Sequence, residues 1–260
     1  MITAVHLYPT TMNTYGDRGN VAALTHRARE RGLEIEWLNV EIGQVAPAEC
    51  DLVFMGGGQD RVQHTVAEDL MQRKAWLQEI VDGHGVVFAV CAGLQLLGRR
   101  YVAADGSELA GLGLLDLQTI AGDWRLIGNV VATVTMSDGQ HVLAGFENHG
   151  GRTLLSGCEP LGTVLAGNGN NGVDGGEGAR SGNVIATYLH GPVLPKNAWL
   201  TDHLLALAVS HSGGDAQLAR LDQSFEDLAQ NEAVAAAQRD LDDQTGGLLR
   251  RARRRIRSLR

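Results

Sequence analysis

Cys91 has the clearest potential for chemistry in this sequence. It follows the apolar run 86–90 (VVFAV), and a helix-forming run begins directly after it. Ala89 and Gly93 stand two positions before and after it, as the sharp turn of a nucleophile elbow requires. Amide groups at a helix start, such as that of Ala92, favour a thiolate and can bind an oxyanion. The spacing predicts a cysteine nucleophile; the alternative is a buried cysteine at a strand end.

A thiolate nucleophile needs a base, and His190 is the histidine that the pattern favours. It follows the apolar run 184–189 and precedes Gly191-Pro192, so we expect it at a strand end in a rigid loop. Sites in open α/β sheets gather at the carboxyl ends of the strands. His149, in a polar segment flanked by glycine, is the alternative base.

The first hundred residues indicate the elements that would position these two side chains. Short apolar runs alternate there with amphipathic stretches, which is typical of βαβ units. The expected strands cover residues 2–8, 33–40, 51–55 and 86–90, and the expected helices cover 17–31 and 66–82. This order predicts an α/β fold with an open, doubly wound, mostly parallel sheet.

After about residue 110 the pattern changes. Residues 130–136 and 153–155 predict strands of more antiparallel character, residues 167–182 form a loop rich in glycine and asparagine, and residues 183–189 predict another strand. The chain then reads as helical, over 199–211 and about 215–239. We therefore expect one α/β domain over residues 1–212 and a helical C-terminal extension over residues 213–260.

Composition limits the class of protein. The chain has 260 residues, 44% of them hydrophobic, which is ordinary for a globular protein. It carries no apolar run of 18 residues and no secretory signal, so we expect a cytoplasmic protein without a transmembrane segment. Cys50, Cys91 and Cys158 show no CxxC spacing, which argues against a disulfide framework and a metal site.

The charge is unevenly distributed. The formal net charge is −8, yet seven of the 22 basic residues are arginines within residues 250–260. The acidic remainder argues against nucleic acid as the main partner. The arginine-rich tail is either a contact for an acidic protein surface, a phosphate or anionic lipid, or a solvated helix end.

Three motifs in combination resemble the class I, triad-type glutamine amidotransferases, in the branch that includes cobyric acid synthase. They are GGGQD at 56–60, VCAGLQLL at 90–97 and YLHGPVLPKN at 188–197. Further segments are similar to the glutaminase subunits of lipid II isoglutaminyl synthases. These are YGDRGN at 15–20, FENHGG at 146–151 and the loop at 167–178. The resemblance covers roughly residues 2–212.

The resemblance implies roles for individual residues. Cys91 matches the nucleophile, and His190 matches the general base and acid. Gly58 matches the residue whose amide joins that of Ala92 in the oxyanion hole. Arg125 matches the arginine that holds the glutamine, and a guanidinium can grip an α-carboxylate with two hydrogen bonds. The alternative for Arg125 is a surface ion pair.

The sequence departs from the family pattern at Pro192. Most class I members carry a glutamate two residues after the histidine, whereas this chain has Pro192 there. The third member is therefore absent or is supplied by Asp17, Glu147 or a backbone carbonyl. Cobyric-type relatives also work without that glutamate, so the departure does not imply an inactive enzyme.

The chain lacks the means to activate a carboxylate for amidation. It has no GxxxxGK[ST] loop, and its only lysines, Lys74 and Lys196, lie outside glycine loops. We therefore expect no cofactor of its own and an ATP-dependent step on another polypeptide. The resemblance implies a heterodimer in which this chain hydrolyses glutamine and a MurT-like Mur-ligase subunit amidates the D-glutamate of the lipid II stem, so that lipid II is reached through the partner.

Three other interpretations stay open at this point. The chain could serve a different synthase, for example one of cobyric type. It could be a non-catalytic binding subunit, against which the presence of both Cys91 and His190 argues. It could be a DJ-1-like or peptidase relative of the same fold, although such proteins need not carry the Arg125 region or the HGP ending.

Overall fold

The computed structural model describes residues 1–13, 16–58 and 60–257, with the backbone alone described for 60–63 and 244–257. Its first sheet has six strands in the order β11-β12-β4-β3-β1-β2. These are β1 (Ile2–Leu7), β2 (Ile35–Val40), β3 (Leu52–Met55), β4 (Val86–Val90), β11 (Ala179–Ser181) and β12 (Val184–Thr187). All pairs are parallel except the edge pair β11–β12. The predicted open, mostly parallel sheet is confirmed.

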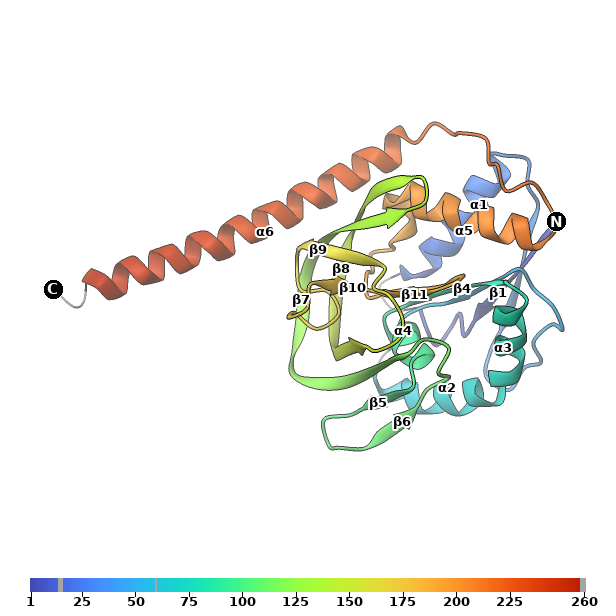
Figure 1. Ribbon diagram of the computed structural model, residues 1–260, viewed down its shortest axis with the longest axis horizontal. Coiled ribbons are helices and arrows are strands. Elements are labelled where there is room, and N and C mark those ends of the chain that lie inside the picture. The colour runs from blue at the N-terminus through green and yellow to red at the C-terminus, as the bar shows by residue number, and fades with distance from the viewer. Residues whose placement is uncertain (14–15, 59, 258–260) are drawn as a thin grey trace.

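Helices cover both faces of this sheet. Figure 1 shows α1 (Arg18–Arg29) and α5 (Ala198–His211) on one face, and α2 (Asp60–Gln72) and α3 (Lys74–Asp82) on the other. Every residue of β3, β4 and β12 is buried, as expected for central strands covered on both sides. The single helix predicted over 66–82 is instead two helices. The break falls at Arg73, whose guanidinium bonds Asp69 and the carbonyl of Glu41.

A second, mainly antiparallel sheet lies beside the first. Its members are β5 (Arg100–Val102), β6 (Glu108–Ala110), β7 (Leu117–Met136), β8 (Gly139–Leu155), β9 (Gly162–Ala166) and β10 (Gly176–Glu177). β7 and β8 form one long ribbon with an irregularity between Ala121 and Leu126. They extend well beyond the predicted strands 130–136 and 153–155. Glycines and charged residues interrupt the alternation of apolar and polar residues along this ribbon. The sequence pattern therefore did not predict its full length.

The C-terminal part begins with the short 3-10 helix η2 (Leu194–Lys196) and α5, and ends with α6 (Ser224–Arg257). The helix predicted over 215–239 thus begins later and continues further. Ala237 of α6 is buried against Val131, Ala144 and Ala166 on the outer side of the β7–β9 region (Figure 1). Polar contacts join Glu226 to Arg27 and Asp240 to Asn129.

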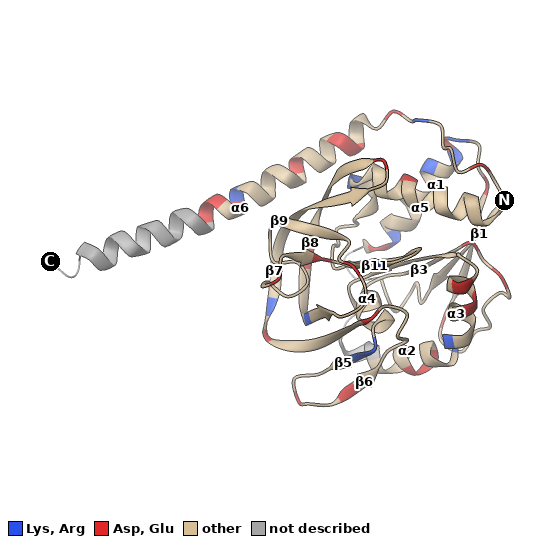
Figure 2. Cartoon of the chain, viewed as in Figure 1, with Lys and Arg blue, Asp and Glu red and all other residues tan. Residues whose placement is uncertain are grey.

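Charged groups are spread over this architecture. Figure 2 shows acidic residues on α3 and along the described part of α6, with basic residues interspersed among them. The arginines of residues 250–260 lie outside the side chains that the structure describes. Within the described residues, every helix is too short or too polar to cross a membrane.

Candidate active site

The backbone at Cys91 has the strained geometry of a nucleophile elbow. Cys91 joins β4 to α4 (Ala92–Leu97) with φ 52° and ψ −104°, a left-handed conformation that non-glycine residues rarely adopt. A Cβ at Gly93 would lie 2.9 Å from the carbonyl oxygen of Met55 and 3.2 Å from Cβ of Ala89. The small residues that the sequence placed around Cys91 are therefore required by close packing. The Cys91 amide donates to the carbonyl of Thr187 on β12 at 2.8 Å, which ties the elbow to the neighbouring strand.

His190 reaches the elbow from the end of that strand. β12 ends at Thr187, and the backbone of His190 then pairs with Phe146 on β8, donating its amide to the Phe146 carbonyl at 2.8 Å. The His190 ring is almost fully buried, and its Nδ1–H donates to Oδ1 of Asp17 at 3.3 Å. Two strand ends and the start of α1 therefore meet at one place.

Gly57 lies at the junction of these three side chains. A Cβ at Gly57 would lie 2.6 Å from Cε1 of His190, 3.2 Å from Oδ2 of Asp17 and 3.4 Å from Cβ of Cys91. Its amide donates to Oδ2 of Asp17 at 2.6 Å. The two oxygens of the Asp17 carboxylate therefore act separately, since one holds His190 and the other holds the glycine loop after β3.

The surroundings of His190 favour its charged form. Burial alone would lower its pKa, but hydrogen bonds to Asp17 and Cys91 and their charges raise the pKa of His190 to about 10. At neutral pH the ring is therefore an imidazolium that holds a proton beside the side chain of Cys91. This is the arrangement of an activated cysteine nucleophile.

Of the groups left open as the third member, the structure places Asp17 against His190. Pro192 replaces the usual glutamate, and its ring packs against the start of α1. A Cβ at Gly19 would lie 2.3 Å from Cγ of Pro192. The side chain of Asn20 accepts from the amide of Leu194 at 2.9 Å. The GDRGN and HGP segments thus fit together closely, and this fit brings Asp17 to the histidine.

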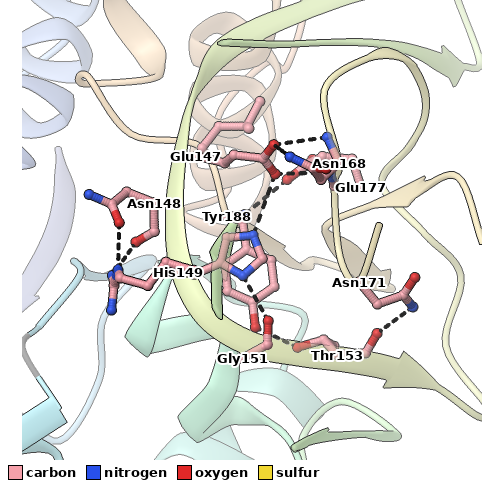
Figure 3. A network of polar contacts seen from close by, with 12 residues as sticks. Glu147, Asn148, His149, Gly151, Thr153, Asn168, Asn171, Glu177 and Tyr188 are labelled. Carbon is pink, nitrogen blue, oxygen red and sulfur yellow. Dashed lines mark hydrogen bonds and ion pairs between the residues drawn. The ribbon is translucent and has the colours of Figure 1, made fainter. Parts of the chain in front are cut away.

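The alternative base, His149, belongs to a separate buried network (Figure 3). Its Nδ1–H donates to the carbonyl of Gly151 at 2.9 Å, and its ring stacks on Tyr188 with centroids 3.6 Å apart. Glu147 accepts from the amide of Gly169 and from both the backbone and side-chain nitrogens of Asn168. Glu147 is therefore engaged with the glycine-rich loop.

Arg125 lies on the exposed irregularity of β7. Its guanidinium donates to the side-chain oxygen of Asn148 at 2.7 Å and to the Asn148 carbonyl at 2.6 Å. Asn148 is two residues from Phe146, which pairs with His190. Arg125 also lines a cavity of about 340 Å³ together with Trp124. The structure therefore holds Arg125 on the exposed ribbon through the neutral side chain and the carbonyl of Asn148, and among the described residues no carboxylate forms an ion pair with it.

Sequence reasoning missed a buried carboxylate behind the site, Glu177 on β10. Its Oε1 accepts from the Thr187 hydroxyl at 2.7 Å and from the Tyr188 amide at 2.9 Å. The hydroxyl of Tyr188 in turn contacts Thr153 and the side chain of Gln95. The available signal was a lone glutamate within a loop of glycines and asparagines, a setting that reads as solvent-exposed.

Glu177 gives a stability prediction with a definite sign. Burial raises its pKa to about 7, against the hydrogen bonds from Thr187 and Tyr188, while the charge of Glu147 raises it further. A carboxyl whose pKa is higher in the folded than in the unfolded protein stabilises the fold at low pH and loses that contribution as pH rises through 7. Glu177→Gln is expected to remove this loss.

The measurement is the free energy of unfolding in urea at pH 5 and pH 8. Wild type should lose about 2–3 kcal/mol more than Glu177→Gln over this range. Glu159→Gln is the matched control, because the Glu159 side chain is 74% exposed and should leave the pH dependence unchanged. Equal pH dependence in wild type and Glu177→Gln would contradict the assignment.

Among the described residues, no group of three or more His, Cys, Asp or Glu side chains is arranged to hold a metal ion. The site is instead a cysteine on an elbow, a histidine and an aspartate at the carboxyl edge of a doubly wound sheet. This combination defines the class of cysteine-dependent α/β enzymes that transfer acyl groups.

The chain belongs to the CobB/CobQ-like glutamine amidotransferase family, whose domain matches residues 3–198. It is 38% identical over 239 residues to the lipid II isoglutaminyl synthase (glutamine-hydrolyzing) subunit GatD of Staphylococcus aureus, covering 92% of this chain and 97% of that protein. The GatD subunit of Streptococcus pneumoniae is also 38% identical, covering 89% of this chain and 88% of that protein. Cobyric acid synthase of Sphingopyxis alaskensis is 31% identical, and the match spans 77% of this chain and 40% of that protein.

Solved structures support the fold. A chain of PurLQS from Thermotoga maritima superposes with a TM-score of 0.53 at 16% identity, covering 82% of this chain and 97% of that chain. The glutaminase domain of CTPS from Trypanosoma brucei also gives a TM-score of 0.53, at 12% identity, covering 86% of this chain and 97% of that chain.

Proposed function

We propose that this chain is the glutaminase subunit of a lipid II isoglutaminyl synthase. The observation that carries the glutaminase chemistry is the meeting of Cys91, His190 and Asp17 at the strained elbow. The synthase is proposed from the relatives. The match to the two GatD subunits covers nearly all of both chains, whereas the match to cobyric acid synthase covers less than half of that protein.

In the proposed reaction the Cys91 thiolate attacks the side-chain amide carbon of glutamine. The tetrahedral oxyanion binds the amides of Gly58 and Ala92, and His190 gives its proton to the nitrogen, which leaves as ammonia. Water then attacks the γ-glutamyl thioester while His190 takes a proton from it, and glutamate is released. Asp17 already accepts from the amide of Gly57, which supports the next amide, Gly58, as the donor toward substrate.

The ammonia is used by a partner. We propose that this chain forms a heterodimer in the cytoplasm with a MurT-like Mur-ligase subunit. That subunit activates the D-glutamate carboxylate of lipid II with ATP. The absence of a GxxxxGK[ST] loop from the sequence supports placing this step on the partner.

The test is glutamate release from glutamine by the purified chain, alone and with the Mur-ligase-like subunit, ATP and lipid II. Release by the chain, with amidated lipid II formed only when both subunits are present, is the expected result. Release that the ligase subunit neither binds nor couples to amidation would favour another synthase, such as one of cobyric type. A folded chain that releases no glutamate in either condition would overturn the glutaminase proposal and favour a binding subunit.

Arg125 is proposed to hold the α-carboxylate of glutamine, and this gives a separate prediction. Arg125→Ala is expected to raise KM for glutamine by at least about 10-fold, because a charge-assisted pair to the substrate is lost. Arg180→Ala is the matched control, because its partly exposed guanidinium lies on the edge strand β11 and pairs with Glu159. Steady-state kinetics with glutamine as the varied substrate measures both. An unchanged KM in Arg125→Ala would mean that Arg125 has only a structural role in the β7–β8 ribbon and does not bind glutamine.

A further inference from the structure

The segment that carries His190 has left the sheet and needs other partners for its backbone. β12 ends at Thr187, three residues before the histidine. The Tyr188 amide donates to Oε1 of Glu177 at 2.9 Å, and the Leu189 amide donates to the Thr187 hydroxyl oxygen at 3.0 Å. That same hydroxyl donates to Oε1 of Glu177 at 2.7 Å. One carboxylate oxygen therefore fixes, directly or through Thr187, both of the amides that lie between the strand and His190.

Glu177 is itself held rigidly. It is buried, and a Cβ at the next residue, Gly178, would lie 2.4 Å from the carbonyl oxygen of Ala186 on β12. Gly178 has φ +64°, so the close approach and the backbone conformation both require glycine there. At the other end of the loop, Glu147 accepts the amide of Gly169 at 2.9 Å (Figure 3). The glycine-rich loop is thus fixed at both ends by buried carboxylates.

Tyr188 links the same segment to the nucleophile. Its hydroxyl lies 3.1 Å from Nε2 of Gln95, which is on the helix that begins after Cys91, and 2.6 Å from the hydroxyl of Thr153. Its ring stacks on His149 (Figure 3). A shift of the Tyr188 backbone would therefore change the place of the histidine relative to the elbow.

We propose that Glu177 is a positioning residue for His190, acting through the Tyr188 amide and the Thr187 hydroxyl. This rests on the proposed function of the site. The glycine-rich loop is then a rigid brace that delivers a carboxylate to the end of β12. Glu177 fixes the backbone of the segment that carries His190, and Asp17 fixes the ring of His190.

The experiment compares Glu177→Ala, Glu177→Gln and wild type in the full chain. Glutamine retains an oxygen that can accept both hydrogen bonds, whereas alanine removes it. Glu177→Ala is expected to lower kcat by about 10²-fold with KM within about twofold of wild type, because a displaced base costs rate and not binding. Glu177→Gln is expected to restore kcat to within about threefold of wild type. Glu159→Gln is the control and should leave both constants unchanged.

A second readout separates positioning from loss of fold and from failure of the glutaminase proposal. The rate at which iodoacetamide alkylates Cys91, followed by mass spectrometry across pH, reports the thiolate that His190 stabilises. The pH at which the alkylation rate is half-maximal (the midpoint) should be higher in Glu177→Ala than in wild type. In Glu177→Gln it should be the same as in wild type, whether or not glutamine is hydrolysed. An unchanged midpoint in folded Glu177→Ala would overturn the proposal.

Thr187 provides the variant to use where Glu177→Ala does not fold. Thr187→Val keeps the shape of the side chain but removes the hydroxyl that contacts both Glu177 and the Leu189 amide. It should shift the alkylation midpoint in the same direction, and Thr187→Ser should restore it. A midpoint that stays at the wild-type pH in Thr187→Val would equally overturn the proposal.

Discussion

Cys91→Ser is expected to lower kcat for glutamine hydrolysis by at least about 10³-fold. Serine fits the same elbow, which the strained φ of 52° at Cys91 and the close approach of Gly93 define. The hydroxyl, however, stays protonated beside an imidazolium, so the attack on the amide has no ready nucleophile. Glutamate release measures the loss. Circular dichroism and the midpoint of thermal unfolding, both unchanged, show that the fold is retained.

The other two cysteines are the controls. Burial raises the pKa of Cys50 to about 12, and burial also raises the pKa of Cys158, so neither is poised as a thiolate at neutral pH. Cys158→Ser and Cys50→Ser should therefore retain full activity, and iodoacetamide should label wild type at Cys91 first. Activity surviving in Cys91→Ser, or lost in Cys158→Ser, would remove the elbow from the mechanism.

The elbow was predictable because its signal is local. A buried strand, a cysteine, small residues at fixed offsets and a helix-forming run occupy twelve consecutive positions. His190 was predictable for a similar reason, since an apolar run that ends in His-Gly-Pro places it at a strand end. The first sheet followed from the continuous apolar runs of its central strands, which are buried on both faces.

The choice among carboxylates was not predictable, because it depends on contacts between distant segments. Asp17 reaches His190, 173 residues further along the chain, only because α1 packs against the loop at Pro192. Glu147 looked equally suitable in sequence but points into the glycine-rich loop (Figure 3). The sequence around Glu177 is typical of an exposed loop, and a buried carboxylate is recognisable only once its hydrogen-bond donors are known.

Asp17→Asn is expected to be the most damaging substitution after loss of the nucleophile. Both oxygens of the carboxylate act as acceptors, one from Nδ1–H of His190 at 3.3 Å and the other from the Gly57 amide at 2.6 Å. Asparagine has one acceptor oxygen and one NH₂ group, so it can satisfy only one of these donors and must oppose the other. Either the histidine loses its tautomer and charge stabilisation, or the glycine loop beside the oxyanion site moves. We expect kcat to fall by about 10²–10⁴-fold.

Asp51→Asn separates this effect from loss of stability. The Asp51 carboxylate also bridges a histidine and a backbone amide, His211 Nδ1 and the Thr3 nitrogen, both at 2.7 Å, but it lies at the start of β3, away from Cys91. Both variants lose one oxygen from an aspartate–histidine pair, so both should be destabilised. Only Asp17→Asn should lose activity at a temperature where each is folded, and its pH–rate profile should change in shape because the proton affinity of His190 depends on Asp17. Equal kcat in the two variants would mean that Cys91 and His190 act as a dyad and that His190 needs no carboxylate, in line with Pro192 at the position of the usual glutamate.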